Sequence, residues 1–148
     1  MPVENPPRPP APAPARGRPA DARRALGRRG EDLAARHLIG LGYSVLARNV
    51  RTRHGEIDLI VFDGSALAFV EVKTHRVHAV AGPRRSHQQP LAWLRERQRA
   101  RLRRLAVAWL SDQKRIRPSA RTIRFDAIGI AVDRSDRLLR IDHVEGAW

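Results

Sequence analysis

The segment from Gly55 to Lys73, GEIDLIVFDGSALAFVEVK, constrains the fold of this chain more than any other. Two runs of β-branched and large apolar residues flank Asp63-Gly64-Ser65, a combination typical of turns, so the pattern predicts a β-hairpin. The two arms nevertheless carry four charged residues, which are Glu56, Asp58, Glu71 and Lys73. Charges in the middle of otherwise apolar strands require an explanation.

The length of the hairpin loop decides whether these charges meet. With a two-residue or four-residue loop, Asp58 lies opposite Glu71, and Glu56 lies opposite Lys73. Because side chains alternate between faces with a period of two, all four charges then share one face. A three-residue loop would place Asp58 and Glu71 on opposite faces. The even loop also opposes apolar residues of the two arms, and it is the register that we expect.

The shared face has two interpretations. Two carboxylates directly opposite each other repel, and a divalent cation bound between them would replace this repulsion by attraction. Oxygen ligands of this kind favour Mg²⁺ or Mn²⁺. Alternatively, Lys73 pairs with Glu56 and the face is simply solvated, as most surface charge clusters are. The spacing alone leaves both interpretations open.

Length and composition narrow the class of protein. A chain of 148 residues predicts one domain, and the lack of cysteine excludes disulfides and zinc–thiolate sites. No apolar run approaches the roughly 18 residues that a membrane span needs, and the N-terminus lacks the apolar region of a secretory signal. We therefore expect a soluble, cytoplasmic protein that does not insert into a membrane.

The net charge of +14 is unevenly distributed along the chain. Residues 75–117 contain twelve Lys and Arg against two acidic residues, a net charge of +10. That density favours a polyanionic partner, which would be a nucleic acid or an anionic surface. The alternative is an arginine-rich proteome, in which the charge has no functional meaning.

The remaining segments predict the elements around the hairpin. Residues 1–20 are a Pro/Ala-rich tail that we expect to be disordered, and residues 21–148 form the single domain. Apolar spacing predicts two helices, over 21–41 and 91–110. Three further strands are predicted over 43–51, 122–132 and 137–148. The expected fold is α/β, a small mixed sheet with flanking helices in the order αβββαββ.

The first predicted helix contains two glycines, Gly27 and Gly30, each costing about 1 kcal/mol relative to alanine. Close approach of the helix backbone to a sheet would explain them, and so would a local break in the helix. Glu31 follows at the edge of the apolar stripe, from which its carboxylate could reach a site on the sheet. An exposed helical glutamate is the alternative interpretation.

The second predicted helix carries arginines around its apolar stripe. The positions suited to clamping phosphates are Arg95, Arg97, Arg99, Arg101 and Arg104. Before this helix, residues 75–90 lose all periodicity and predict a basic loop, in which His75 and His78 lack partner ligands for a metal site. Asp126 lies in the middle of a predicted strand. It is either another member of the acidic site or a charge on an edge strand.

Five segments in this order, GRRGEDLAARHL, GYSVLARNVR, GEIDLI, FVEVKTH and IRFDAIGI, resemble the YraN family of uncharacterised bacterial proteins. The resemblance covers residues 24–148. That family is placed in the PD-(D/E)xK restriction-endonuclease-like superfamily and is similar in outline to archaeal Holliday-junction resolvases. The resemblance therefore implies a restriction-endonuclease-like core. His75 and Gln98 depart from the family pattern, in which basic residues are common at both positions.

The resemblance also implies residue roles. Asp58 matches the Asp of the superfamily motif, Glu71 its acidic position and Lys73 its lysine. Glu31 matches the glutamate that resolvase-like members carry on a helix. The implied ligands of a Mg²⁺ or Mn²⁺ ion are Asp58, Glu71, the main-chain carbonyl of Val72, and Glu31. Lys73 would orient or deprotonate the attacking water.

The implied activity is that of a metal-dependent nuclease, with DNA as the expected nucleic acid and a homodimer as the form in which resolvase-like relatives act. The alternative belongs to another class of protein. A nucleic-acid-binding or assembly module can keep the fold without turnover, because fold does not determine function.

Overall fold

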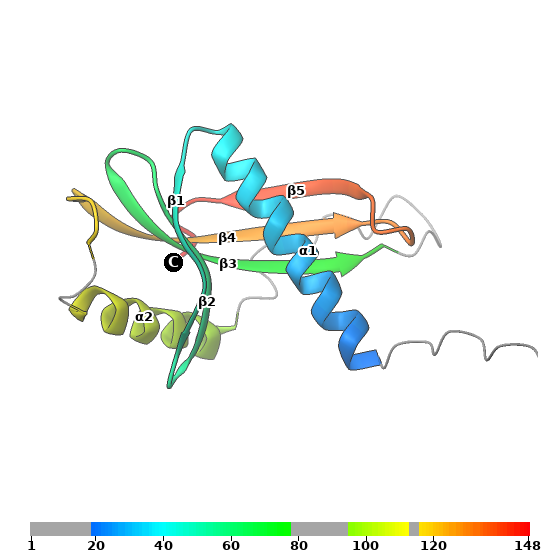
Figure 1. Cartoon of the computed structure of the whole chain (residues 1–148), viewed down its shortest axis with the longest axis horizontal. Coiled ribbons are helices and arrows are strands. Elements are labelled where there is room, and N and C mark those ends of the chain that lie inside the picture. Colours follow the sequence, from blue (N-terminus) through cyan, green and yellow to red (C-terminus); the bar gives the residue numbers. More distant parts are fainter. Residues whose placement is uncertain (1–18, 78–94, 113–115) are drawn as a thin grey trace, which may run out of the picture.

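The computed structural model describes residues 19–77, 95–112 and 116–148. The elements are α1 (Pro19–Gly40), β1 (Ser44–Thr52), β2 (Gly55–Phe62), β3 (Ala66–Arg76), α2 (Glu96–Ser111), β4 (Thr122–Val132) and β5 (Leu138–Val144) (Figure 1). Their order is the expected αβββαββ. The predictions for the N-terminal tail, for most of the basic loop and for the start of the second helix lie outside the described residues.

One five-stranded sheet, in the order β1-β2-β3-β4-β5, forms the centre of the molecule. Neighbouring strands are antiparallel except for β3 and β4, which run parallel from the Ala66–Thr122 pair to the Arg76–Val132 pair. A parallel pair needs a crossover connection, and α2 lies in that connection. The prediction of a loop from His75 is wrong for its first two residues, because pairing with β4 continues β3 through Arg76.

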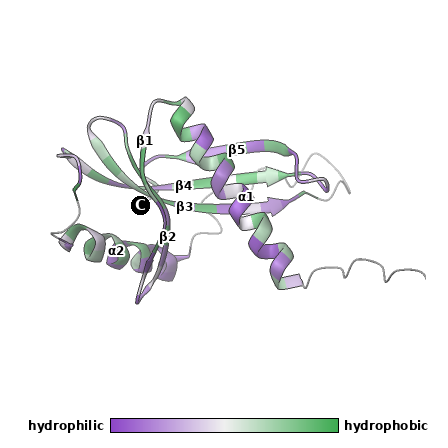
Figure 2. Cartoon of the chain, viewed as in Figure 1, coloured by the Kyte–Doolittle hydropathy of each residue, from purple (hydrophilic) through white to green (hydrophobic). Residues whose placement is uncertain are grey.

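A helix covers each face of the sheet. Under α1 lies one apolar cluster, which includes Leu38 of α1 and Val70 of β3. Under α2 lies a second cluster, which includes Trp109 of α2 and Phe69 of β3. Because β3 is buried on both faces, its apolar run is nearly continuous, as Figure 2 shows for the centre of the sheet. Within the described ranges, neither helix combines the length and apolar character needed to cross a membrane.

The backbone of α1 approaches the sheet closely at Gly30. A Cβ atom at Gly30 would lie 1.6 Å from Oγ1 of Thr74 in β3, whereas a Cβ atom at Gly27 would have no neighbour within 4 Å. The helix continues through both residues. Close approach is therefore the correct explanation for Gly30, and a break in the helix is not. Since Gly30 precedes Glu31 and Thr74 follows Lys73, this contact places α1 against the charged end of β3.

Candidate active site

Strands β2 and β3 separate at the predicted charged residues. Their ladder comprises four pairs, from Leu59–Val70 to Phe62–Leu67, in the register that the even loop predicts. Toward Gly55, β2 continues beside β1, whereas beyond Val70 β3 continues beside β4 (Figure 1). Asp58 and Glu71 are the first residues past the shared ladder. We call this separation of β2 from β3, bounded by Asp58 and Glu71, the fork.

The carboxylate of Asp58 bridges the fork. Its Oδ2 accepts a hydrogen bond from the backbone N–H of Val72, at 2.7 Å. Burial is the largest influence on this group, and together with the charge of Glu71 it raises the pKa of Asp58 to about 7, with a smaller contribution from Glu31. The hydrogen bond from Val72 and the charge of Lys73 act in the opposite direction. In the absence of a compensating cation, the ionised form of Asp58 is disfavoured.

Glu71 and Lys73 form an ion pair on one face of β3. Lys73 Nζ lies 2.9 Å from Glu71 Oε1, and the Glu71 side chain is 5% exposed against 43% for Lys73. The prediction that Glu56 lies opposite Lys73 is wrong, because β2 has turned away with β1 at that point. Glu56 pairs instead with Arg51 of β1, at 3.4 Å. A buried Glu71 also contradicts the interpretation of this face as simply solvated.

Glu31 reaches the site from α1. It is half-buried, and its charge contributes to the raised pKa of Asp58. Its Oε2 accepts a hydrogen bond from Nδ2 of Asn49 in β1, at 2.5 Å. The structure thus brings together at the fork all four predicted residues, Glu31, Asp58, Glu71 and Lys73, from three different elements. Asn49 was not singled out from the sequence, although asparagine is depleted in strands and such a position is itself a signal.

The donor set at the fork fits a divalent cation in part. A buried carboxylate, Glu71, and a half-buried one, Asp58, with an unfavourable mutual charge suit an ion that prefers oxygen ligands. Within the described ranges, however, no group of three or more His, Asp or Glu side chains is arranged to hold a metal ion. The fit therefore rests on Asp58 and Glu71. Ligand roles for Glu31 and for the carbonyl of Val72 stay predictions.

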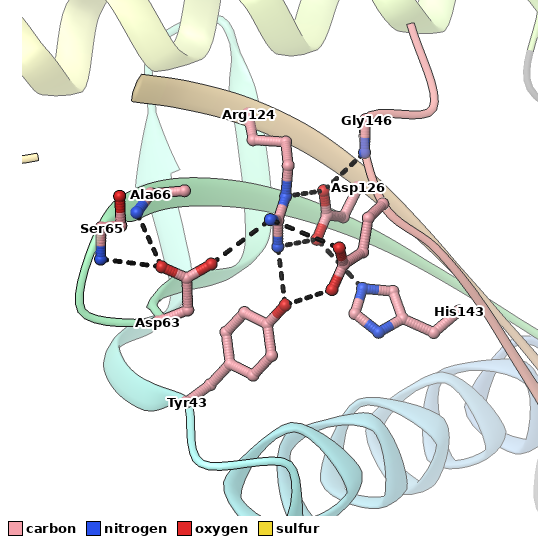
Figure 3. Close-up of polar contacts among 9 residues, drawn as sticks. Tyr43, Asp63, Ser65, Ala66, Arg124, Asp126, His143 and Gly146 are labelled. Atoms are coloured by element: carbon pink, nitrogen blue, oxygen red, sulfur yellow. Dashed lines mark hydrogen bonds and ion pairs between the residues drawn. The ribbon is translucent and has the colours of Figure 1, made fainter. Parts of the chain in front are cut away.

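Asp126 belongs to a different cluster, which Figure 3 shows. It is fully buried on β4 and accepts hydrogen bonds from Arg124 at 2.8 Å and from the backbone of Gly146 at 3.0 Å, with His143 Nε2 at 3.0 Å. Burial would raise the pKa of Asp126, but the contacts with His143 and Arg124 outweigh burial and lower it. Since β4 lies between β3 and β5, the interpretation as an edge-strand charge is wrong.

The same cluster joins three distant segments around Arg124. The guanidinium donates to the hydroxyl of Tyr43 at 2.7 Å and lies 3.3 Å from Asp63 in the turn between β2 and β3. The Tyr43 hydroxyl in turn donates to Glu145, at 2.5 Å (Figure 3). Asp126 thus serves to hold the C-terminal segment against β4. Its carboxylate is already occupied by these partners and is not shared with the fork.

Of the predicted phosphate-clamping arginines, Arg95 is the N-cap of α2 and the others lie within the helix. Those that are exposed are Arg95, Arg97, Arg101 and Arg104. Arg99 is half-buried, and its Nε has no hydrogen-bond partner among the described residues. Positions 97, 101 and 104 recur at helical spacing, so they line one flank of α2. Arg101 lies against the turn between β1 and β2, with Nη1 3.5 Å from where a Cβ atom of Gly55 would be.

Comparison with known proteins identifies the family. Residues 30–130 match the family model described as "Uncharacterised protein family UPF0102". The chain belongs to UPF0102. This confirms the resemblance to the YraN family that the sequence motifs indicated. All four fork residues of this UPF0102 protein lie within the matched range.

Individual UPF0102 relatives align over most of their length. The UPF0102 protein of Acidothermus cellulolyticus is 41% identical over 136 residues, covering 87% of this chain and 97% of the relative. That of Streptomyces griseus is 46% identical over 114 residues, covering 77% and 88%. That of Pelotomaculum thermopropionicum is 38% identical over 129 residues, covering 87% and 99%. The UPF0102 assignment therefore applies to most of the chain rather than to a single motif.

Proposed function

We propose that this UPF0102 protein is a Mg²⁺- or Mn²⁺-dependent nuclease that hydrolyses phosphodiester bonds in a nucleic acid, with DNA as the expected substrate. The observation that carries the proposal is the pair of carboxylates at the fork, of which Glu71 is buried and Asp58 is half-buried. Two like charges in such a place are unfavourable without a cation. A carboxyl group with a strongly raised pKa beside a lysine is typical of functional sites rather than of packing.

Each fork residue has a role in this chemistry. A bound divalent cation would supply Lewis-acid stabilisation of the phosphate and a more acidic water. Asp58 and Glu71 would hold the cation, together with the Val72 carbonyl and with Glu31, directly or through a water. Lys73 orients the attacking water or accepts its proton, and its charge offsets that of the phosphate. The ion pair with Glu71 keeps the Lys73 ammonium group at the fork.

We expect Asp58→Ala to reduce cleavage at least about 100-fold, because it removes one of the two carboxylates that would hold the cation. Binding of nucleic acid should persist. The measurement is a cleavage assay on linear, nicked, flapped and four-way substrates with Mg²⁺ and with Mn²⁺. Glu56→Ala is the matched control, since Glu56 lies on the same strand but pairs with Arg51 away from the fork. Metal-dependent cleavage retained in Asp58→Ala would refute the assignment.

The exposed flank of α2 provides the contact to the nucleic-acid backbone in this proposal. We expect the double variant Arg97→Gln/Arg104→Gln to weaken binding and to reduce the slope of log K against log [salt] by about 2, since each phosphate contact contributes about 0.9. Arg134→Gln, an exposed arginine in the turn between β4 and β5, is the control for overall charge. Since Arg134→Gln removes one charge and the double variant removes two, an effect half as large in Arg134→Gln would show that α2 is not the binding surface.

One observation favours the alternative of a non-catalytic nucleic-acid-binding module. The described residues contain no group of three acidic or histidine side chains arranged around a metal position, and Glu71 is already paired with Lys73. Calorimetric titration with Mg²⁺ and Mn²⁺ separates the two functions. Absence of metal binding at millimolar concentration, with nucleic acid still bound, would establish the module.

A further inference from the structure

Strand β1 has an irregular backbone directly opposite the fork. Asn49 has a φ of 50°, and it is one of two non-glycine residues in the described ranges with a positive φ. Asparagine adopts this left-handed region more readily than most residues do. In the β1–β2 ladder, the pairs Arg48–Leu59 and Val50–Ile57 flank Asn49 and Asp58. The irregular residue and the site aspartate therefore occupy facing positions on neighbouring strands.

At these facing positions, the side chains of β2 change from one face of the sheet to the other. Leu59 of β2 packs under α1, whereas Ile57, two residues earlier, packs under α2. In a regular strand, residues two apart lie on the same face. Asp58 sits at the change of face between them. The left-handed residue on β1 and the change of face on β2 thus form one local feature, and it aims Asp58 into the fork.

Two successive residues of β1 reach α1 across this feature. Arg48 pairs with Asp32, and Asn49 donates a hydrogen bond to Glu31. Regular alternation would send successive side chains to opposite faces. The two contacts differ in charge. Arg48 neutralises Asp32, whereas the amide of Asn49 orients Glu31 and leaves its negative charge intact.

We propose that Asn49 is a positioning residue for the cation site, acting through its side-chain amide on Glu31 and through its left-handed backbone on Asp58. This inference rests on the proposed metal-dependent function and adds a residue to it. A neutral donor to a carboxylate fixes the orientation of a metal ligand, and loss of such partners typically costs 10- to 100-fold in metal affinity. Asn49 thereby links α1 and β2, the two elements that flank the fork opposite β3.

Two variants separate the amide from the backbone. Asn49→Gly retains the left-handed conformation and removes the amide, whereas Asn49→Ala removes the amide and strains the backbone. We expect Asn49→Gly to weaken Mn²⁺ affinity, measured by calorimetry, about tenfold, and Asn49→Ala to weaken it further. Arg48→Ala is the matched control. It removes the neighbouring contact between β1 and α1 and should leave Mn²⁺ affinity unchanged.

A double-mutant cycle that combines Asn49→Gly with Glu31→Ala tests whether the amide of Asn49 acts through Glu31. The affinity loss caused by Asn49→Gly should disappear in the Glu31→Ala background. A loss of equal size in that background, or an equal loss in Arg48→Ala, would overturn the proposal. If the unaltered protein binds no Mn²⁺, the proposed nuclease function fails. The role of Asn49 at a cation site then fails with it. The urea midpoints of four metal-free proteins, the unaltered chain, Asn49→Gly, Glu31→Ala and the double variant, test the coupling of Asn49 to Glu31 separately, and strictly additive effects of the two substitutions would overturn that coupling.

Discussion

Gly30→Ala is expected to push α1 away from β3 and to destabilise the protein by about 3 kcal/mol, the top of the usual range for overpacked cores. The new Cβ atom would lie 1.6 Å from Oγ1 and 2.8 Å from Cβ of Thr74. Rotation of the threonine side chain relieves the first contact but not the second, because Cβ is fixed to the backbone of β3. Urea denaturation measures the loss, and Mn²⁺ affinity should fall with it because Glu31 adjoins the displaced residue.

Gly27 provides the matched control for this prediction. It lies one turn earlier in the same helix, and a Cβ atom there would meet no atom within 4 Å. Gly27→Ala should therefore raise the free energy of unfolding by up to about 1 kcal/mol, the difference in helix propensity. Thr74→Gly removes the atoms that a Cβ atom at Gly30 would meet, and it should partly rescue Gly30→Ala. Equal effects of Gly27→Ala and Gly30→Ala would refute this account of the α1–β3 contact.

The sequence predicted the fold, and it singled out the four residues that the structure brings together at the fork. Turn chemistry and period-two alternation gave the register of the β2–β3 hairpin, which the Ile60–Phe69 pair confirms. Helical spacing left Glu31 either facing a site on the sheet or exposed, and the YraN resemblance favoured the first of these interpretations. The order of the elements followed from hydrophobic periodicity alone. These features are local, or are encoded in motifs, and a sequence therefore carries them directly.

The errors occurred where two paired strands separate. Alternation continues along a strand regardless of its neighbour, so it could not show that the pairing of β2 with β3 ends at Leu59 while the pairing of β2 with β1 continues to Gly55. Glu56 was therefore placed opposite Lys73, although it pairs with Arg51. Asp126 posed the same difficulty, because its partners are determined by tertiary packing. A buried charge in a strand looks the same in sequence whether it binds a cation or an arginine.

Asp58→Asn is expected to abolish cleavage and, at pH 8, to stabilise the metal-free protein. The pKa of Asp58 is about 7 in the folded protein against 3.8 for an unperturbed carboxyl group. The folded state therefore binds this proton more tightly than the unfolded state does. The stability that Asp58 contributes is complete below about pH 4, falls as the pH rises toward 7, and is absent above that. Asparagine can still accept the hydrogen bond from Val72, and it carries no charge to repel Glu71.

The gain in the free energy of unfolding that Asp58→Asn gives at pH 8 is bounded by the difference between the two pKa values. That difference corresponds to about 4 kcal/mol at most. Urea denaturation at pH 5 and pH 8 measures it. The unaltered protein should lose stability between the two values relative to Asp58→Asn. Addition of Mn²⁺ at pH 8 should restore the stability of the unaltered protein and leave the variant unchanged, because only a cation bound to the folded state stabilises it.

Asp126→Asn is the control, and its expected effect on stability is opposite to that of Asp58→Asn. The pKa of Asp126 is lowered by His143 and Arg124, so its charge stabilises the folded protein above the usual carboxyl pKa. Removing that charge leaves Arg124 partly unpaired, and loss of one partner of a buried pair costs about 3–5 kcal/mol. Both residues are aspartates within strands, yet one substitution should stabilise and the other destabilise at pH 8. If Asp58→Asn also destabilises, Asp58 is a structural residue and the carboxylate pair at the fork no longer supports a cation site.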